Sequence, residues 1–173
     1  ALVGQGVELG NAQSELLAFL EKADIPCGRT LLGLSAVPSD CRLNKGMLGM
    51  HGNLGPNVKT NECDVLIAIG MRFDDRVTGN LDTYAKQAKI IHLDIDPSEI
   101  GKNVKVDVPV LGDCKETLAE LTKLIREAKH TEWIDSFAAY EQKEFEQVIE
   151  KEVYPKEGPL NMGEVVNAVS EAT

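Results

Sequence analysis

Residues 64–76 read DVLIAIGMRFDDR and join an uninterrupted apolar run to a charged loop. The run at residues 65–69 lacks polar alternation, which is typical of a strand covered on both faces in the middle of a parallel sheet. It ends at Gly70, and four ionisable residues follow closely: Arg72, Asp74, Asp75 and Arg76. Ligands of open α/β sheets bind beyond the carboxyl ends of the strands. This loop is therefore a candidate site, with a solvated loop as the alternative interpretation.

The rest of the chain supplies strands and helices in alternation. Apolar runs predict strands at residues 1–3, 25–27, 89–96 and 106–111. Helices are predicted at residues 11–23 with Asn11 as the N-cap, at 80–86, and at 114–128 with Asp113 as the N-cap. Strands that alternate with helices form a parallel sheet. We therefore predict an α/β fold, a Rossmann-like parallel sheet flanked by helices, over residues 1–127.

The sequence after residue 127 predicts a helical C-terminal extension. Residues 128–160 indicate a charged helical connector followed by a linker that contains proline and glycine. Residues 161–173 predict an amphipathic helix whose apolar stripe has no remaining partner. We expect this helix to start a truncated C-terminal domain. Because the sequence opens with ALVG, as though inside a strand, we expect the chain to be a piece of a longer protein.

The composition is that of a globular protein and argues against several classes of partner. The 173 residues are 43% hydrophobic and 27% charged, as is ordinary for a globular domain. A net charge of −10 argues against a nucleic-acid partner, and no segment approaches the roughly 18 apolar residues of a membrane span. The four cysteines form no C-x-x-C pair, so no metal site is predicted from them and we expect a reduced, cytoplasmic setting.

Two glycine-containing segments are candidates for ligand binding. Gly4, Gly6 and Gly10 approximate the G-x-G-x-x-G fingerprint, with the third glycine one residue late. Such glycines let the backbone approach a pyrophosphate, although a tight strand-to-helix turn explains them too. Residues 46–52 read GMLGMHG within the long connection 30–61, and their apolar side chains need a flat ligand or an adjoining domain to pack on. His51 has no partner at readable spacing, so a structural role is favoured over acid–base catalysis.

A strand that ends in carboxylates is the third candidate. Asp94 and Asp96 close the predicted strand 89–96, where a carboxylate commonly accepts a hydrogen bond from a ribose hydroxyl or an adenine amine. The two lie on one face at a spacing of two, so a metal pair is conceivable. No third ligand is evident, and we predict no metal site. No convincing catalytic constellation is visible in these residues.

Four blocks together resemble a known family. GMLGMHG at 46–52, IAIGMRFDDRVTGNL at 67–81, AKIIHLDIDPSEIGKNV at 88–104 and VPVLGD at 108–113 resemble the central domain of acetohydroxyacid synthase (acetolactate synthase) large subunits. The resemblance runs from residue 4 to about residue 124. Gln5 departs from the family pattern, which has a glycine there, and Cys114 replaces a more usual aliphatic residue.

The resemblance implies an enzyme that needs thiamine diphosphate. Its two outer domains hold thiamine diphosphate and Mg²⁺, and the central domain holds FAD, which undergoes no net redox change. The parent condenses two pyruvates, or pyruvate and 2-ketobutyrate, with loss of CO₂. The products, 2-acetolactate or 2-aceto-2-hydroxybutyrate, lead to the branched-chain amino acids. The resemblance also implies a homodimeric or homotetrameric parent with a small regulatory subunit. The fragment by itself is expected to be inactive.

The resemblance assigns cofactor contacts along the chain. The pyrophosphate region would contact Gly4 and Gly6. The flavin half would contact Thr30, Leu31, Leu32, Leu48, Gly49, Met50 and His51. The middle of the extended FAD would contact Gly70, Met71, Arg72, Asp74, Arg76 and Val77. The adenosine end would contact Asp94, Ile95, Glu99, Gly112, Asp113 and Cys114. Met50, Asp75 and Arg76 would also face the channel that leads the 2-ketoacid substrate to thiamine.

Three other functions are compatible with the residues. A self-standing NAD(P)-dependent oxidoreductase is permitted by the Gly4-x-Gly6 turn and by Asp94, although no acid–base residue is placed for hydride transfer. The central domain of another thiamine enzyme, which binds no flavin or a different adenine nucleotide, is a closer alternative. A module that binds no ligand and only another protein is the last.

Overall fold

The sheet is six-stranded and parallel throughout. The computed structural model describes residues 1–172 and orders the strands β3-β2-β1-β4-β5-β6. Their bounds are β1 Leu2–Val3, β2 Cys27–Arg29, β3 Asn44–Met47, β4 Val65–Ile69, β5 Lys89–Asp94 and β6 Val108–Leu111. The prediction of a Rossmann-like parallel sheet is confirmed, and the apolar run that decided it lies between β1 and β5. The order reverses between β1 and β4, which is the switch point where such sheets bind ligands.

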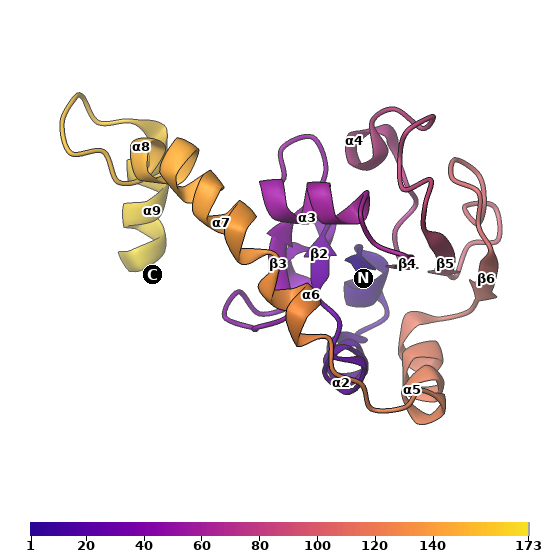
Figure 1. The fold of residues 1–173 in the computed structure, drawn as a ribbon. Coiled ribbons are helices and arrows are strands. Elements are labelled where there is room, and N and C mark those ends of the chain that lie inside the picture. Colours follow the sequence, from indigo (N-terminus) through magenta and orange to yellow (C-terminus); the bar gives the residue numbers. More distant parts are fainter. Residues whose placement is uncertain (173) are drawn as a thin grey trace. The chain divides into compact units, whose positions relative to one another are not determined.

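Helices cover both faces of this sheet. They are α1 Gly6–Leu9, α2 Gln13–Ala23, the 3₁₀ helix η1 Leu31–Ala36, α3 Leu54–Thr60, α4 Asp75–Thr78, α5 Cys114–Leu124 and α6 Thr131–Asp135. The long α2 and α5 pack together on one side, and α3 lies on the other (Figure 1). Alternate side chains of β4 point to opposite faces of the sheet. Ile67 and Ile69 pack in the core under α2 and α5, whereas Leu66 and Ala68 pack in a second cluster with Phe73.

The compact unit that contains the sheet runs from Ala1 to Phe137. It extends past residue 127 because α6 buries Ile134 in the core and because Lys59 Nζ lies 4.5 Å from the centre of the Trp133 ring. The second unit begins at Ala138 and contains α7 Ala138–Glu144, the π-helical turn η2 Phe145–Ile149, α8 Glu150–Glu152 and α9 Met162–Ala172.

Two helix predictions are wrong for local reasons, and a third helix is shorter than predicted, since α5 ends at Leu124 and not at residue 128. Asn11 is not an N-cap, because it adopts a left-handed backbone (φ 49°) and ends the short α1, and α2 starts at Gln13. Residues 80–86 form turns and not a helix. The helix of this region is α4, because Asp74 accepts a hydrogen bond from the Arg76 amide and Gly79 ends the turn with a positive φ. Asp113 does cap α5, accepting bonds from the Lys115 and Glu116 amides.

A buried carboxylate fastens the chain that leaves α5. Asp24 is 2% exposed at the C-terminus of α2, and its carboxylate accepts hydrogen bonds from the Arg42 guanidinium and, at 2.7 Å, from the His130 amide. The His130 amide, and then Arg42, hold the pKa of Asp24 below its usual 3.8. The carboxylate therefore ties three segments that are far apart in sequence, namely α2, the loop at residue 42 and the segment at residue 130.

Replacing Asp24 with Asn should lower the melting temperature at pH 7, since the amide cannot offer a charged acceptor to both donors. A carboxylate whose pKa is lowered by folding stabilises the fold above its unfolded value of 3.8, and loses this effect as the pH falls through the folded pKa. Thermal unfolding followed by circular dichroism should show the difference from wild type shrinking on acidification. The exposed Asp40→Asn is the control, and an equal loss at pH 7 and in acid contradicts the account.

Candidate functional site

Three glycines meet where β1 and β4 end. The Gly4 amide donates to the Ile69 carbonyl, and the Gly6 amide donates to the Gly70 carbonyl, both at 3.0 Å. A methyl group on Gly4 would overlap the Gly70 carbonyl oxygen, and one on Gly6 would lie 2.7 Å from the Gly70 Cα. Gly70 itself has φ +57°. The glycines are therefore needed first for the close approach of two chain segments, and the resulting surface lines a cavity.

The cavity measures about 900 Å³ and opens at the carboxyl ends of the central strands. This volume is at the upper end of small-molecule sites. Most of the residues assigned to the cofactor line it: Gly4, Gly6, Thr30, Leu31, Leu32, Leu48, Met50, His51, Gly70, Met71, Arg72, Asp74, Arg76, Val77, Asp94, Ile95, Glu99, Asp113 and Cys114. The residues assigned from sequence come from segments far apart in the chain, and the fold brings these segments to one place.

Three predicted residues do not line the cavity. Gly49 (φ +102°) packs against the loop beyond β4, because a methyl group there would lie 2.6 Å from the Arg76 carbonyl oxygen. Gly112 donates its amide to the Asp94 carbonyl at 3.0 Å. Asp75 is exposed at the start of α4.

Five lining residues were not assigned to the cofactor from sequence: Gln5, Leu9, Gly10, Met47 and Phe73. All five lie within the quoted glycine and RFDDR motifs, with Leu9 between Gly6 and Gly10, so taking whole motifs would have found them.

One end of the cavity is apolar. Leu31 and Leu32 begin η1 and remain 68% and 61% exposed, and Met50 is 61% exposed, although all three line the cavity. Leu48 is buried beneath them. Large apolar side chains left in water at a concave site are characteristic of a surface that a flat apolar ligand covers.

The middle of the cavity carries the charges of the RFDDR loop. Arg72 Nε lies 3.3 Å from Asp74 Oδ2, while Asp74 Oδ1 caps α4. The Met50 amide donates to the Arg76 carbonyl at 2.7 Å, and the Arg76 guanidinium reaches the Met50 sulfur at 3.8 Å. The structure thus joins Met50 and Arg76, two of the residues predicted to face a substrate channel.

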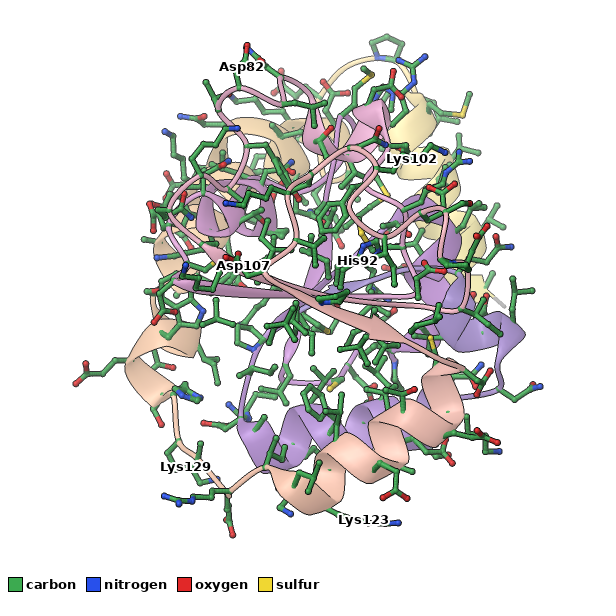
Figure 2. All side chains as sticks on the ribbon, turned by 90° about the vertical axis from the view of Figure 1, so that its right-hand side faces the viewer. Asp82, His92, Lys102, Asp107, Lys123 and Lys129 are labelled. Atoms are coloured by element: carbon green, nitrogen blue, oxygen red, sulfur yellow. The ribbon has the colours of Figure 1, made fainter. Side chains whose placement is uncertain are left out.

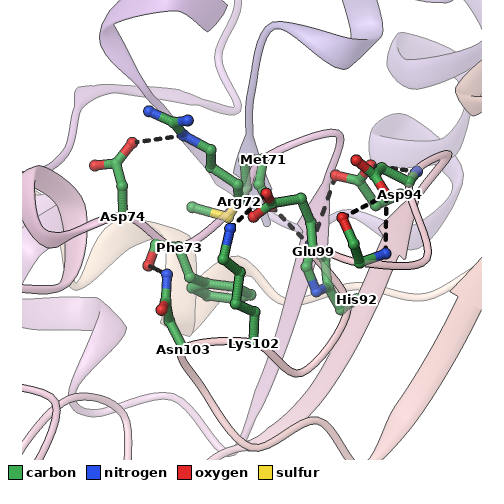
Figure 3. A network of polar contacts seen from close by, with 11 residues as sticks. Met71, Arg72, Phe73, Asp74, His92, Asp94, Glu99, Lys102 and Asn103 are labelled. Atoms are coloured by element: carbon green, nitrogen blue, oxygen red, sulfur yellow. Dashed lines mark hydrogen bonds and ion pairs between the residues drawn. The ribbon is translucent and has the colours of Figure 1, made fainter.

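The other end of the cavity is acidic. Asp94 closes β5 and accepts the Asp96 amide on Oδ1 at 2.9 Å. Glu99 pairs its Oε1 with Lys102 at 2.8 Å, whereas its Oε2 is buried and lacks a hydrogen-bond partner among residues 1–172 (Figure 3). A buried acceptor in a cavity wall fits a ligand that donates a hydrogen bond.

The other ionisable groups near this end are already satisfied or inert. Asp96 is used within its own turn, where hydrogen bonds from Ser98 lower the pKa of its carboxyl. Burial, and then Asp113 and Asp94, raise the pKa of Cys114 to about 12, so its thiol stays protonated and is a poor nucleophile.

In the part of the chain that the structure describes, His, Cys, Asp and Glu side chains do not gather in groups of three or more that could hold a metal ion. Among the same residues, none of the helices has the length and apolar character of a membrane span.

The fold and this site define a class of protein. The family model described as thiamine pyrophosphate enzyme, central domain, matches residues 1–121, and the chain belongs to that family.

Curated relatives narrow the likeness. A probable acetolactate synthase large subunit of Methanocaldococcus jannaschii is 52% identical over 120 residues, which cover 69% of this chain and 20% of the relative. An acetolactate synthase large subunit of Corynebacterium glutamicum is 48% identical over 138 residues (77% and 22%). That of Parasynechococcus marenigrum is 39% identical over 171 residues (96% and 27%). The chain spans roughly a fifth to a quarter of the length of these relatives.

Replacing Gly4 with Ala should lower the free energy of unfolding by about 2 kcal/mol, because the new methyl group meets backbone that cannot move aside. Gly101→Ala is the matched control, since Gly101 has φ +72° but open space around it. Its left-handed backbone costs an alanine about 1 kcal/mol. Chemical denaturation measures both. A Gly4→Ala variant as stable as wild type contradicts the close approach.

Proposed function

We propose that the cavity binds FAD and that the chain is the FAD-binding central domain of an acetolactate synthase large subunit. The single observation that carries the binding role is one cavity whose apolar, charged and acidic lining residues follow β2, β4 and β5, in the order of these strands in the sheet. FAD has the same order of parts: a flat apolar flavin, a pyrophosphate and an adenosine. A cavity of about 900 Å³ is large enough to hold much of such a ligand.

The residues present fit this ligand at each part. Leu31, Leu32 and Met50 offer the exposed apolar wall for the flavin. Gly4 and Gly6 present backbone without side chains, and Arg72, whose side chain is 68% exposed, offers a cation to the pyrophosphate. The Asp113 carboxylate already caps the N-terminus of α5, whereas the loop beyond β4 brings the cations Arg72 and Arg76 to the cavity.

The acidic end suits the adenosine. Asp94 Oδ2 and the partnerless Glu99 Oε2 are acceptors without a competing amide donor, and ribose hydroxyls and the adenine amine are donors. Two carboxylates here would also repel a ribose phosphate, so a ligand with free ribose hydroxyls is favoured.

We infer that the parent is an acetolactate synthase, as the names of the relatives suggest. Thiamine diphosphate and Mg²⁺ would be held by other domains of the parent and would supply the decarboxylating chemistry. The residues of this chain bind FAD and shape the approach of the 2-ketoacid through Met50, Asp75 and Arg76. Pyruvate, alone or with 2-ketobutyrate, gives 2-acetolactate or 2-aceto-2-hydroxybutyrate, and this fragment alone catalyses neither reaction.

The proposed setting is a cytoplasmic oligomer. All four cysteines are free thiols, which accords with a reducing compartment. We infer that the parent is a homodimer or homotetramer that works with a small regulatory subunit. The name large subunit that these relatives carry implies that they work with a smaller subunit.

Calorimetric titration of the chain with FAD tests the binding role. We expect the wild type to bind FAD in preference to NADH. Glu99→Gln should weaken FAD roughly tenfold, because a neutral amide accepts hydrogen bonds less strongly than a carboxylate. FMN, which has no adenosine, should bind Glu99→Gln and wild type alike.

Glu120→Gln is the matched control. Glu120 and Lys123 form an ion pair at the same spacing of three residues as Glu99 and Lys102, but Glu120 does not line the cavity. Its loss should leave the affinity for FAD unchanged. Tighter binding of NADH than of FAD would favour an oxidoreductase, and binding of neither would contradict the proposed role.

A further inference from the structure

His92 is a buried polar residue that the proposed function does not use. It lies within β5, opposite Ala68 of β4, and its side chain is fully buried, whereas Asp82 and Lys123 lie at the edge of the molecule (Figure 2). Two of the residues around it, Phe73 and Met71, are apolar and buried. An aliphatic side chain would fill this position without the cost of burying an imidazole, so the polar group needs an explanation.

The imidazole holds the loop that follows β4. His92 Nε2 lies 2.8 Å from the carbonyl oxygen of Met71. A carbonyl only accepts hydrogen bonds, so Nε2 carries a proton and donates it to the Met71 carbonyl. The other nitrogen, Nδ1, has no partner among residues 1–172. The imidazole therefore directs an N–H at the backbone of the cavity wall.

The His92 ring also packs against a strained residue, Phe73, which follows Met71 by two positions. Phe73 has φ +51°, a left-handed backbone that a bulky residue rarely adopts. Its ring meets the rings of His92 and Tyr84 edge to face, with centroids 5.0 Å and 6.2 Å apart. Its carbonyl accepts a hydrogen bond from the side-chain amide of Asn103 at 3.0 Å (Figure 3). This conformation sets the directions in which Arg72 and Asp74 leave the loop, and both line the cavity.

The acidic end of the cavity is in reach of the same imidazole. Asp94 follows His92 by two residues on β5, so both side chains emerge on the same face of the sheet. Asp94 Oδ2 lies 3.9 Å from His92 Nε2, beyond hydrogen-bond distance but close enough for electrostatic attraction. His92 thus lies between a carbonyl of the middle wall and a carboxylate of the adenosine end.

We propose that His92 is a positioning residue that fixes the Met71–Phe73 backbone and the Asp94 carboxylate as one unit. It thereby sets the spacing between the pyrophosphate and adenosine parts of the FAD site. This inference rests on the proposed function and deepens it. His92 touches no ligand itself, since it is not part of the cavity lining. A residue that only filled the core would leave the relative affinity for FAD and FMN unchanged.

Two polar substitutions separate positioning from filling. His92→Gln keeps an N–H donor near the place of Nε2, whereas the shorter His92→Asn cannot reach the Met71 carbonyl. Both bury one amide, so their cost in solvation is matched. We expect His92→Asn to weaken FAD roughly tenfold, the size of one lost hydrogen bond, with FMN changed less than about twofold. His92→Gln should stay within about threefold of wild type for both ligands.

The wild-type chain gives a second readout that needs no substitution. With ¹⁵N-labelled histidine, the three imidazoles are resolved by NMR, and His92 should show an Nε2-protonated ring before and after saturation. Saturation with FAD should shift its Nε2 signal, because Asp94 gains a ligand donor. FMN should leave that signal in place.

The outcomes distinguish the two proposals. Failure of the wild type to bind FAD overturns the proposed function and the role of His92 with it. Binding by wild type, with equal affinities in the Asn and Gln variants or an Nε2 signal that ignores FAD, overturns only the role of His92.

Discussion

The contact of Gly4 and Gly6 with Gly70 is the constraint on which the remaining structure depends. These residues end β1 and β4, the two neighbouring strands at which the strand order reverses. The Gly4 amide donates to the Ile69 carbonyl and the Gly6 amide to the Gly70 carbonyl, with no side chain between the two segments. The turn after β1 and the loop after β4 consequently form a continuous floor. With side chains at these positions, the two segments would stand apart and the floor would be lost.

The walls of the cavity follow from what each strand carries at its carboxyl end. The segment after β2 contributes the apolar start of η1, and the segment after β3 contributes Met50. The segment after β5 contributes the acidic turn with Glu99. Because β2 and β5 lie on opposite sides of the central pair, the apolar and acidic walls stand at opposite ends of one groove. The chemical gradient along the site is thus a consequence of strand order.

The sequence predicts this architecture best where one interaction dominates. The apolar run of β4 needs burial on both faces, and Asp113 precedes an amphipathic helix, so both were predicted from local pattern alone. The sequence did not predict β3 within the connection 30–61, because Asn44, Lys45 and Gly46 are poor strand formers. They form a strand because they pair with β2.

The left-handed backbones of Asn11 and Phe73 were also not predicted from the sequence. Asn11 tolerates that conformation by itself, and its amide and the following residues end α1. Phe73 is held there by residues more than ten positions away in the chain, among them His92 and Asn103. Most of the predicted site residues converge on one cavity, but the support beneath them depends on tertiary contacts that no motif encodes.

The most direct test of the central claim is a crystal structure of the chain grown with saturating FAD. The account predicts one extended FAD along the cavity, with the flavin at Leu31 and Met50, the pyrophosphate over the glycine floor and the adenosine at Asp94 and Glu99. An FAD bound in the reverse direction or elsewhere on the chain, or crystals whose cavity stays empty, would contradict it.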